Sequence, residues 1–333
     1  MSRGEPGRIC PVRYRYGPGA IASAPTRPAQ TLYVAGGLYG NTPALDCIEA
    51  TADAEERDVT LCFNGDFNWF DVADAQFVEI NRRVFAHDAI QGNVEAEFDA
   101  ATDDAGCGCA YPDSVEAGVV ERSNRIHALL RATASRHSEI RSRIAKLPMV
   151  ARYQVAGCRI GVVHGDAEAL AGWRFDVDAL DAPDAPAWLR SVAATAQVDL
   201  FASTHTCLPA MRRVSLQGGS DGWVVNNGAA GMPNFTDDLS GLITRVGVTP
   251  RGHLTLPACD RERGRGGGCL RGVGARALRC DVLAVDLSGT VAGGFRCLGI
   301  VFPADHPGAG VHARASSFRS SRSIDDYRRD RNL

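Results

Sequence analysis

Short apolar runs that end in small or polar residues recur through residues 1–250 of this 333-residue chain. They include 31–37, 59–66, 159–166 and 198–204, and stretches of helical composition lie between several of them. Strands that alternate with helices indicate an α/β fold, and open α/β sheets place their sites at the carboxyl ends of the strands. The residues that follow each strand therefore constrain both fold and function.

The remaining elements follow from periodicity and from turn residues. A hairpin is predicted where 149–155 meets 159–166 at Ala156-Gly157. Helices are predicted over 43–55, 73–86, 114–145 and 185–196, and further strands over 89–93, 223–231 and 241–250.

Composition divides the chain into three regions. Residues 1–29 are rich in Pro, Gly and Arg and are predicted to form an irregular arm, whereas 30–250 is predicted to be the folded domain. Residues 251–333 form an Arg/Gly-rich tail of low complexity, which we expect to be partly disordered. Because acidic residues outnumber basic ones before this tail, electrostatic binding of nucleic acid is disfavoured.

Cellular context is suggested by what the sequence lacks. A hydrophobic fraction of 45% can supply a core, yet no run approaches the ~18 apolar residues of a membrane helix. The first residues carry Arg without the apolar stretch of a secretory signal. The 11 cysteines are odd in number and irregularly spaced, so we expect reduced thiols. A cytoplasmic protein without a membrane partner is predicted; its oligomeric state is left open.

Six motifs stand at or near the predicted strand ends, and each alone is typical of an ordinary turn. They are GGLYGN (36–41), NGDFNWFD (64–71), QGNVEAE (91–97), VVHGD (162–166), STHTCLP (203–209) and NNGAAGMPN (226–234). In this order they resemble the calcineurin-like metallophosphoesterases, and above all a small bacterial phosphodiesterase-like branch in which the first motif continues Gly-Asn-x-x-Ala-Leu, here 40–45. The resemblance covers 31–248.

The resemblance implies an α/β fold built as a two-sheet β-sandwich flanked by helices, with metal ions at one end. Residue by residue, Asp66 matches the carboxylate that bridges two ions, and Asn93 matches the amide ligand. His164 and His205 match two of the histidine ligands. Such donors suit Mn²⁺, Fe²⁺, Zn²⁺ or Ni²⁺, and we expect one or two ions per chain.

The departures from the family pattern affect the ligands of one of the two ions. Gly37 and Tyr39 replace the Asp and His of the first motif, and Cys207 replaces the second His of the fifth. Val94 stands where the family has a His that is often credited as general acid. One site is therefore expected to be complete, while its neighbour has lost three ligands.

Three alternatives follow for the vacated site. The protein could be a hydrolase with one ion, or thiols could rebuild the second site, or catalysis could be lost. Rebuilding would use Cys207 with Cys107 or Cys109, and predicts that one of the latter sulfurs lies near Cys207. The competing interpretation makes Cys107-Gly-Cys109 a tight loop with inert thiols.

The residues expected to touch substrate are less well supported. Tyr39 could donate a hydrogen bond to a phosphate oxygen, Asn41 and Asn68 follow strand ends, and Arg122 could pair with phosphate unless it lies on a solvated helix face. The sequence predicts a metal-dependent phosphoesterase that hydrolyses a small phosphomonoester or phosphodiester with a metal-activated water. The alternative is a non-hydrolytic, metal-dependent protein that binds or senses a phosphorylated ligand.

Overall fold

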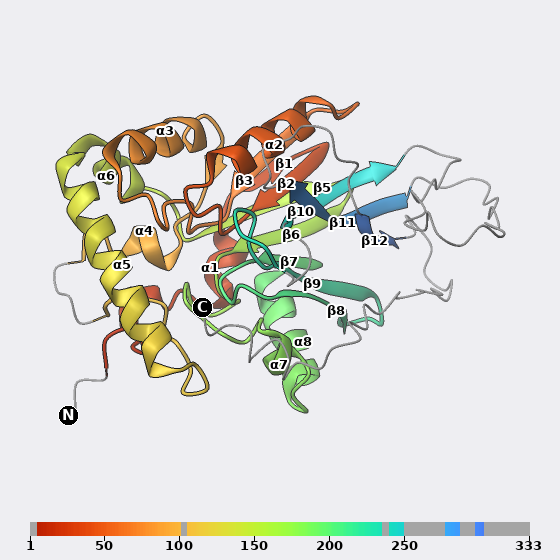
Figure 1. Cartoon of the computed structure of the whole chain (residues 1–333). Helices are drawn as coiled ribbons and strands as arrows, with labels where there is room; N and C mark the ends of the chain where they lie inside the picture. The colour runs from red at the N-terminus through yellow and green to blue at the C-terminus, as the bar shows by residue number, and fades with distance from the viewer. Residues whose placement is uncertain (1–4, 101–104, 235–239, 250–276, 287–296, 303–333) are drawn as a thin grey trace, which may run out of the picture.

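Two six-stranded sheets lie face to face in the computed structural model of the chain (Figure 1), which describes residues 5–100, 105–234, 240–249, 277–286 and 297–302. The first sheet has the order β1 (Thr26–Pro28), β5 (Val150–Val155), β6 (Cys158–Val163), β7 (Leu200–Ser203), β9 (Asp221–Asn227), β8 (Pro209–Ser215). The second has the order β12 (Cys297–Phe302), β11 (Ala277–Asp286), β10 (Ser240–Thr249), β2 (Thr31–Ala35), β3 (Val59–Phe63), β4 (Asp88–Ala89).

The strands that lead into the motifs run parallel within each sheet. In the second sheet β2, β3 and β4 are parallel neighbours, and in the first sheet β6, β7 and β9 are parallel neighbours. Because parallel strands end at the same edge, the loops that follow them gather at one end of the sandwich.

Alternation along β2 explains why both faces of its sheet are covered. Leu32 packs between the two sheets with Val162, while Tyr33 points to the opposite face and joins a cluster with Leu45 and Ile80. A strand buried on both faces is continuously apolar, as β2 is.

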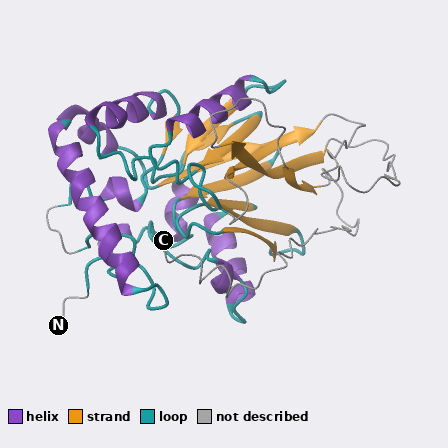
Figure 2. Cartoon of the chain, viewed as in Figure 1, coloured by secondary structure: helices purple, strands orange, loops and turns teal. Residues whose placement is uncertain are grey.

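Helices complete a four-layer arrangement. The outer face of the second sheet is covered by α2 (Thr42–Asp53) and α3 (Asp74–Val84), and that of the first by α1 (Gly17–Ser23) and α8 (Ala185–Ala196). Figure 2 shows further helices gathered beside one end of the sheets; these are α4 (Asn93–Ala96), α5 (Ala117–Arg136) and α6 (Ser138–Ile144). Two short elements, η1 (Val12–Tyr14) and α7 (Val177–Leu180), lie in the connections.

The predicted two-sheet α/β architecture with flanking helices is confirmed. The hairpin at Ala156-Gly157 joins β5 to β6 as expected, and α8 spans the predicted 185–196. Strand β8, which pairs with β9 through seven residues, was not predicted from the sequence. Within the described residues, no helix combines the length and apolarity that crossing a bilayer requires.

The predicted irregular arm is wrong for residues 12–28. This stretch forms η1, α1 and β1, and β1 extends the first sheet by pairing in parallel with β5. Ile21 is fully buried against α8, so the segment belongs to the core. Its Pro and Gly content suggested irregularity, but Pro18 lies in the first turn of α1, where a missing N–H costs nothing.

The predicted boundary at residue 251 falls inside the second sheet. Strands β11 and β12 come from the Arg/Gly-rich tail, and β11 pairs antiparallel with β10 over ten residues. No strands were predicted there, although 281–286 and 297–302 are largely apolar. The rest of the tail lies outside the described residues.

Candidate metal centre

A left-handed turn follows β3 and presents Asp66. Gly65 and Asp66 have φ of 95° and 54°, and a Cβ on Gly65 would lie 2.5 Å from the Gly92 backbone. The loops after β3 and β4 therefore approach closely. The Glu95 carboxylate joins them, because it accepts hydrogen bonds from the backbone N–H groups of Asp66 (2.8 Å), Asn68 (3.1 Å) and Gly92 (3.0 Å).

His164 and His205 follow the parallel neighbours β6 and β7. The backbone N–H of His205 donates to the His164 carbonyl at 3.0 Å, which holds the two loops together. His164 Nδ1 lies 2.8 Å from the Asn64 carbonyl. Since a carbonyl only accepts, this nitrogen carries the proton, and Nε2 of the neutral ring keeps its lone pair.

Two backbone carbonyls of the Cys107-Gly108-Cys109 turn orient the side chains of His205 and Asn93 from outside the cluster. His205 Nε2 lies 3.0 Å from the Cys109 carbonyl, so His205 Nδ1 keeps the lone pair. Asn93 donates through Nδ2 to the Cys107 carbonyl at 2.9 Å, which turns its Oδ1 toward His164. Partners of this kind fix the ring tautomer and orientation of metal-binding residues.

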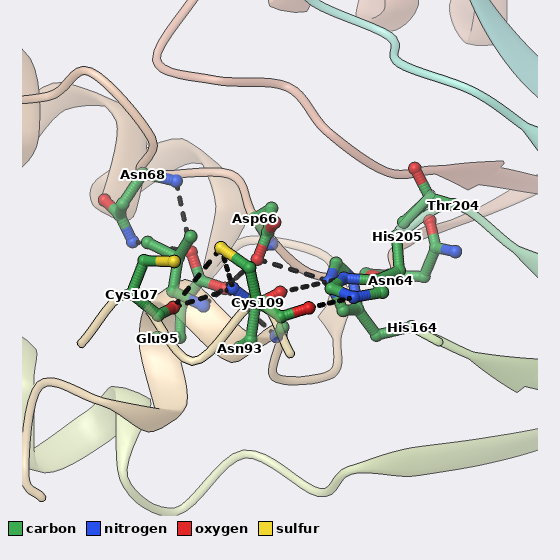
Figure 3. A network of polar contacts seen from close by, with 12 residues as sticks. Asn64, Asp66, Asn68, Asn93, Glu95, Cys107, Cys109, His164, Thr204 and His205 are labelled. Carbon is green, nitrogen blue, oxygen red and sulfur yellow. Dashed lines mark hydrogen bonds and ion pairs between the residues drawn. The ribbon is translucent and has the colours of Figure 1, made fainter. Parts of the chain in front are cut away.

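Four acceptor atoms consequently converge on one point (Figure 3). His164 Nε2 lies 3.0 Å from Asn93 Oδ1, 3.1 Å from His205 Nδ1 and 3.4 Å from Asp66 Oδ1. Ligand atoms of Asp66, His164 and His205 all fall within 4.8 Å of one another. A proton on His164 Nε2 could form a hydrogen bond to only one of the three neighbouring atoms. A divalent cation could instead be bound by these three atoms and by Nε2 itself. The donor set therefore fits a metal ion.

Electrostatics within the cluster follow from burial and from mutual attraction. Burial opposes charge on both Asp66 and His164, yet their attraction outweighs it, raising the pKa of His164 and lowering that of Asp66. Burial and the neighbouring charge of His164 together lower the pKa of His205 to about 3. His205 is therefore neutral at neutral pH, as a metal ligand must be.

Two residues at the vacated positions contact each other through their side chains and contact the backbone of the ligand residues. The Tyr39 hydroxyl lies 2.8 Å from Cys207 Sγ. The Cys109 thiol instead lies 3.4 Å from Asn93 Nδ2, and Cys107 is fully buried. Among the described residues, the group of Asp, Glu, His and Cys ligand atoms that converges within 4.8 Å contains no thiol.

The residues expected to touch substrate are used differently in the fold. The Asn41 side chain accepts from Ala44 N as the N-cap of α2, and it donates to the Gly231 carbonyl. Asn68 is fully buried and accepts a hydrogen bond from Asn81. Both side chains hydrogen-bond within the fold, and their contact with substrate stays a prediction. Arg122 is exposed on α5.

Two positioning carboxylates were missed by the sequence analysis. Glu95 stands where the family pattern has Asp or Glu after its histidine, so its signal was present. Asp166 follows His164 by two residues and accepts from the backbone N–H groups of Glu168, Ala169 and Arg174, which shapes the loop after β6. A Gly-Asp pair alone does not distinguish this role from an ordinary turn.

Comparisons with known proteins yield similarities of fold. No known family profile matches the sequence, and no curated protein matches it. Among solved structures, a metallophosphoesterase from Sphaerobacter thermophilus is 14% identical, with a TM-score of 0.42 over 65% of this chain and 82% of that one. The hypothetical protein PH1004 from Pyrococcus horikoshii OT3 is 15% identical, with a TM-score of 0.46 over 64% and 82%. Vps29 from Entamoeba histolytica, complexed with zinc, is 12% identical, with a TM-score of 0.37 over 82% and 99%.

Proposed function

We propose that this chain is a metal-dependent phosphoesterase acting on a small phosphomonoester or phosphodiester. The observation that carries the proposal is the convergence of four side-chain acceptor atoms on one point. Asp66, Asn93, His164 and His205 would hold the ion, and their oxygen and imidazole donors suit Mn²⁺, Fe²⁺, Zn²⁺ or Ni²⁺. When bound, such a cation neutralises phosphate charge and lowers the pKa of a coordinated water.

The protein's own contribution is a preorganised site. The Asn64 and Cys109 carbonyls fix both imidazole rings before substrate arrives, so little reorganisation is needed on binding. Asn93 and His164 are fully buried, whereas Asp66 and His205 keep 7% and 6% exposure. Substrate would therefore approach from the side of Asp66 and His205.

Residue 94, where the family has a histidine, limits the kinds of leaving group that the site can release. Val94 is 1% exposed and packs in a cluster with Phe77 and Phe98, so this position offers no proton donor. A leaving group that departs as a stable anion needs no proton transfer. Aryl esters should therefore be hydrolysed better than alkyl esters.

The same observation supports the alternative of a binding or sensing protein. Without a proton donor at residue 94, the ion could hold a phosphorylated ligand that is never cleaved. The two functions differ only in turnover, since both require metal and phosphate binding.

The test uses metal-loaded protein with p-nitrophenyl phosphate and bis-p-nitrophenyl phosphate. We expect hydrolysis that disappears on chelation and returns when metal is added back. His164→Ala, prepared in parallel, measures contaminating phosphatase. Wild-type turnover no higher than that of His164→Ala, together with tight binding of inorganic phosphate, would favour the binding protein.

A further inference from the structure

Tyr39 fills space beside Asp66 that the first motif would otherwise leave open. Gly37 has φ of 63°, and a Cβ placed on it would lie 3.1 Å from Tyr39 Cζ and 3.2 Å from the Tyr39 hydroxyl. An acidic side chain at residue 37 would therefore project into the tyrosine ring. The two replaced positions of this motif are coupled, because the small residue makes room for the large one.

Cys207, the third replaced position, closes the same space from another loop. Its sulfur lies 2.8 Å from the Tyr39 hydroxyl, although the residues are 168 positions apart. Cys207 is exposed, whereas Tyr39 is 9% exposed. The Tyr39–Cys207 contact thus joins a nearly buried side chain to an exposed one.

Tyr39 is also tied to the ligand-bearing turn. Its backbone N–H donates to the Asp66 carbonyl at 3.2 Å, and its own φ of 55° is in the left-handed region. A non-glycine residue in this region carries backbone strain, which persists where the surroundings enforce it. A phenol is a hydrogen-bond donor at neutral pH.

We propose that the centre holds a single metal ion and that Tyr39 takes the place of the second. Its hydroxyl donates a hydrogen bond to a phosphoryl oxygen, supplying at one point the positive potential that a second ion would give. This inference rests on the proposed function for its ligand, a phosphate group. It predicts one ion per chain and a phosphate affinity that depends on the Tyr39 hydroxyl.

The first measurement is metal content by mass spectrometry on the full-length wild-type chain. Protein is stripped with a chelator, loaded with excess Mn²⁺ or Zn²⁺ and passed through a desalting column. We expect one ion per chain, lost in Asp66→Asn. Two ions per chain, both lost in Asp66→Asn, would overturn the proposal, because Tyr39 would then leave room for the second ion.

The second measurement is binding of inorganic phosphate to metal-loaded protein by calorimetry. Tyr39→Phe keeps the ring and removes the hydroxyl, so metal content should stay at one while phosphate affinity falls about 10-fold or more. The matched control is Tyr33→Phe, on the same strand-loop unit, whose hydroxyl contacts Glu55. Unchanged affinity in Tyr39→Phe would show that the ring only fills space and would overturn the donor role.

Turnover separates this inference from the proposed function. If wild-type protein binds one ion and binds phosphate through Tyr39 without hydrolysing either aryl ester, the hydrolase proposal fails and the inference stands. If the protein hydrolyses esters with two bound ions, the inference fails and the hydrolase stands. Activity with one ion should fall about 10- to 100-fold in Tyr39→Phe.

Discussion

The two halves of the site differ in how their side chains are used. In one half, Asp66, Asn93, His164 and His205 direct acceptor atoms toward a common point. Backbone carbonyls hold the outer atoms of Asn93, His164 and His205, and the Val94 backbone N–H donates to Asp66 Oδ1. In the other half, Tyr39 contacts Cys207 directly, and the Tyr39 ring occupies the space beside Gly37. The first half presents a set of acceptor atoms that a cation could bind, whereas in the second half two side chains contact each other.

The difference shows that the replaced ligands form a packed unit rather than scattered losses. A glycine, a tyrosine and a cysteine from two distant loops fill one volume together. The ligand half, in contrast, retains the backbone contacts that orient its donors.

The largest effect should come from a ligand. Asp66→Asn removes the only carboxylate of the cluster, so we expect loss of bound metal and a fall in aryl ester hydrolysis of about 10³-fold. Metal analysis and steady-state kinetics measure both. Asp74→Asn, an exposed change on α3, is the matched control. Full metal content in Asp66→Asn would remove the basis for the metal centre.

The next effect concerns the residue that positions the Asp66 turn. Glu95→Gln replaces one of two carboxylate oxygens that accept backbone N–H groups, so metal affinity should fall about 10- to 100-fold. Competition with a fluorescent chelator measures the affinity. Exposed Glu79→Gln serves as control. If Glu95→Gln loses stability but keeps its metal affinity, Glu95 stabilises the loops without affecting metal binding, and the prediction is wrong.

A smaller effect should appear beneath the vacated half. Asp71 is fully buried, neither of its oxygens finds a donor among the described residues, and burial with the nearby charge of Glu95 raises its pKa to about 8. The folded state then holds a proton that the unfolded chain loses near pH 4. Stability therefore declines as pH rises from about 4 to about 8, and the full cost remains above that range.

Asp71→Asn should remove that cost. We expect stabilisation of about 2 kcal/mol at pH 9, or roughly 4–8 °C in the midpoint of thermal unfolding, and little change at pH 4.5. Thermal melts across this pH range give the comparison. Equal shifts at both values would contradict a buried titrating carboxyl.

The smallest effect concerns packing in the vacated half. Gly37→Ala places a Cβ 3.1 Å from Tyr39 Cζ in a left-handed conformation, so we expect destabilisation of about 1–2 kcal/mol in urea unfolding. Gly19→Ala in α1 is the control, since a Cβ there meets nothing within 4 Å and alanine favours helix. A neutral Gly37→Ala would mean that Tyr39 moves freely from the space it occupies.

Much of the ligand half could be predicted from the sequence because its signals are local. Asp66, His164 and His205 each follow a buried strand directly, and parallel strands bring their carboxyl ends to one edge. The identities of these residues and their order along the chain were enough to predict that they lie close together. The same local signals predicted β2, β3, β6 and β7.

The sequence by itself determined the alternation of strands and helices and the donor types at the strand ends, because both depend on neighbouring residues. Only the tertiary structure decided which imidazole nitrogen keeps its lone pair, since this depends on the carbonyls of Asn64 and Cys109, which lie 100 and 96 positions away from their partners. It also decided that β1 joins the edge of the first sheet and that β11 and β12 extend the second, because strand pairing depends on residues distant in the sequence. The tertiary structure also decided the Tyr39–Cys207 contact, since two loops that are distant in the sequence must come together before these side chains can meet.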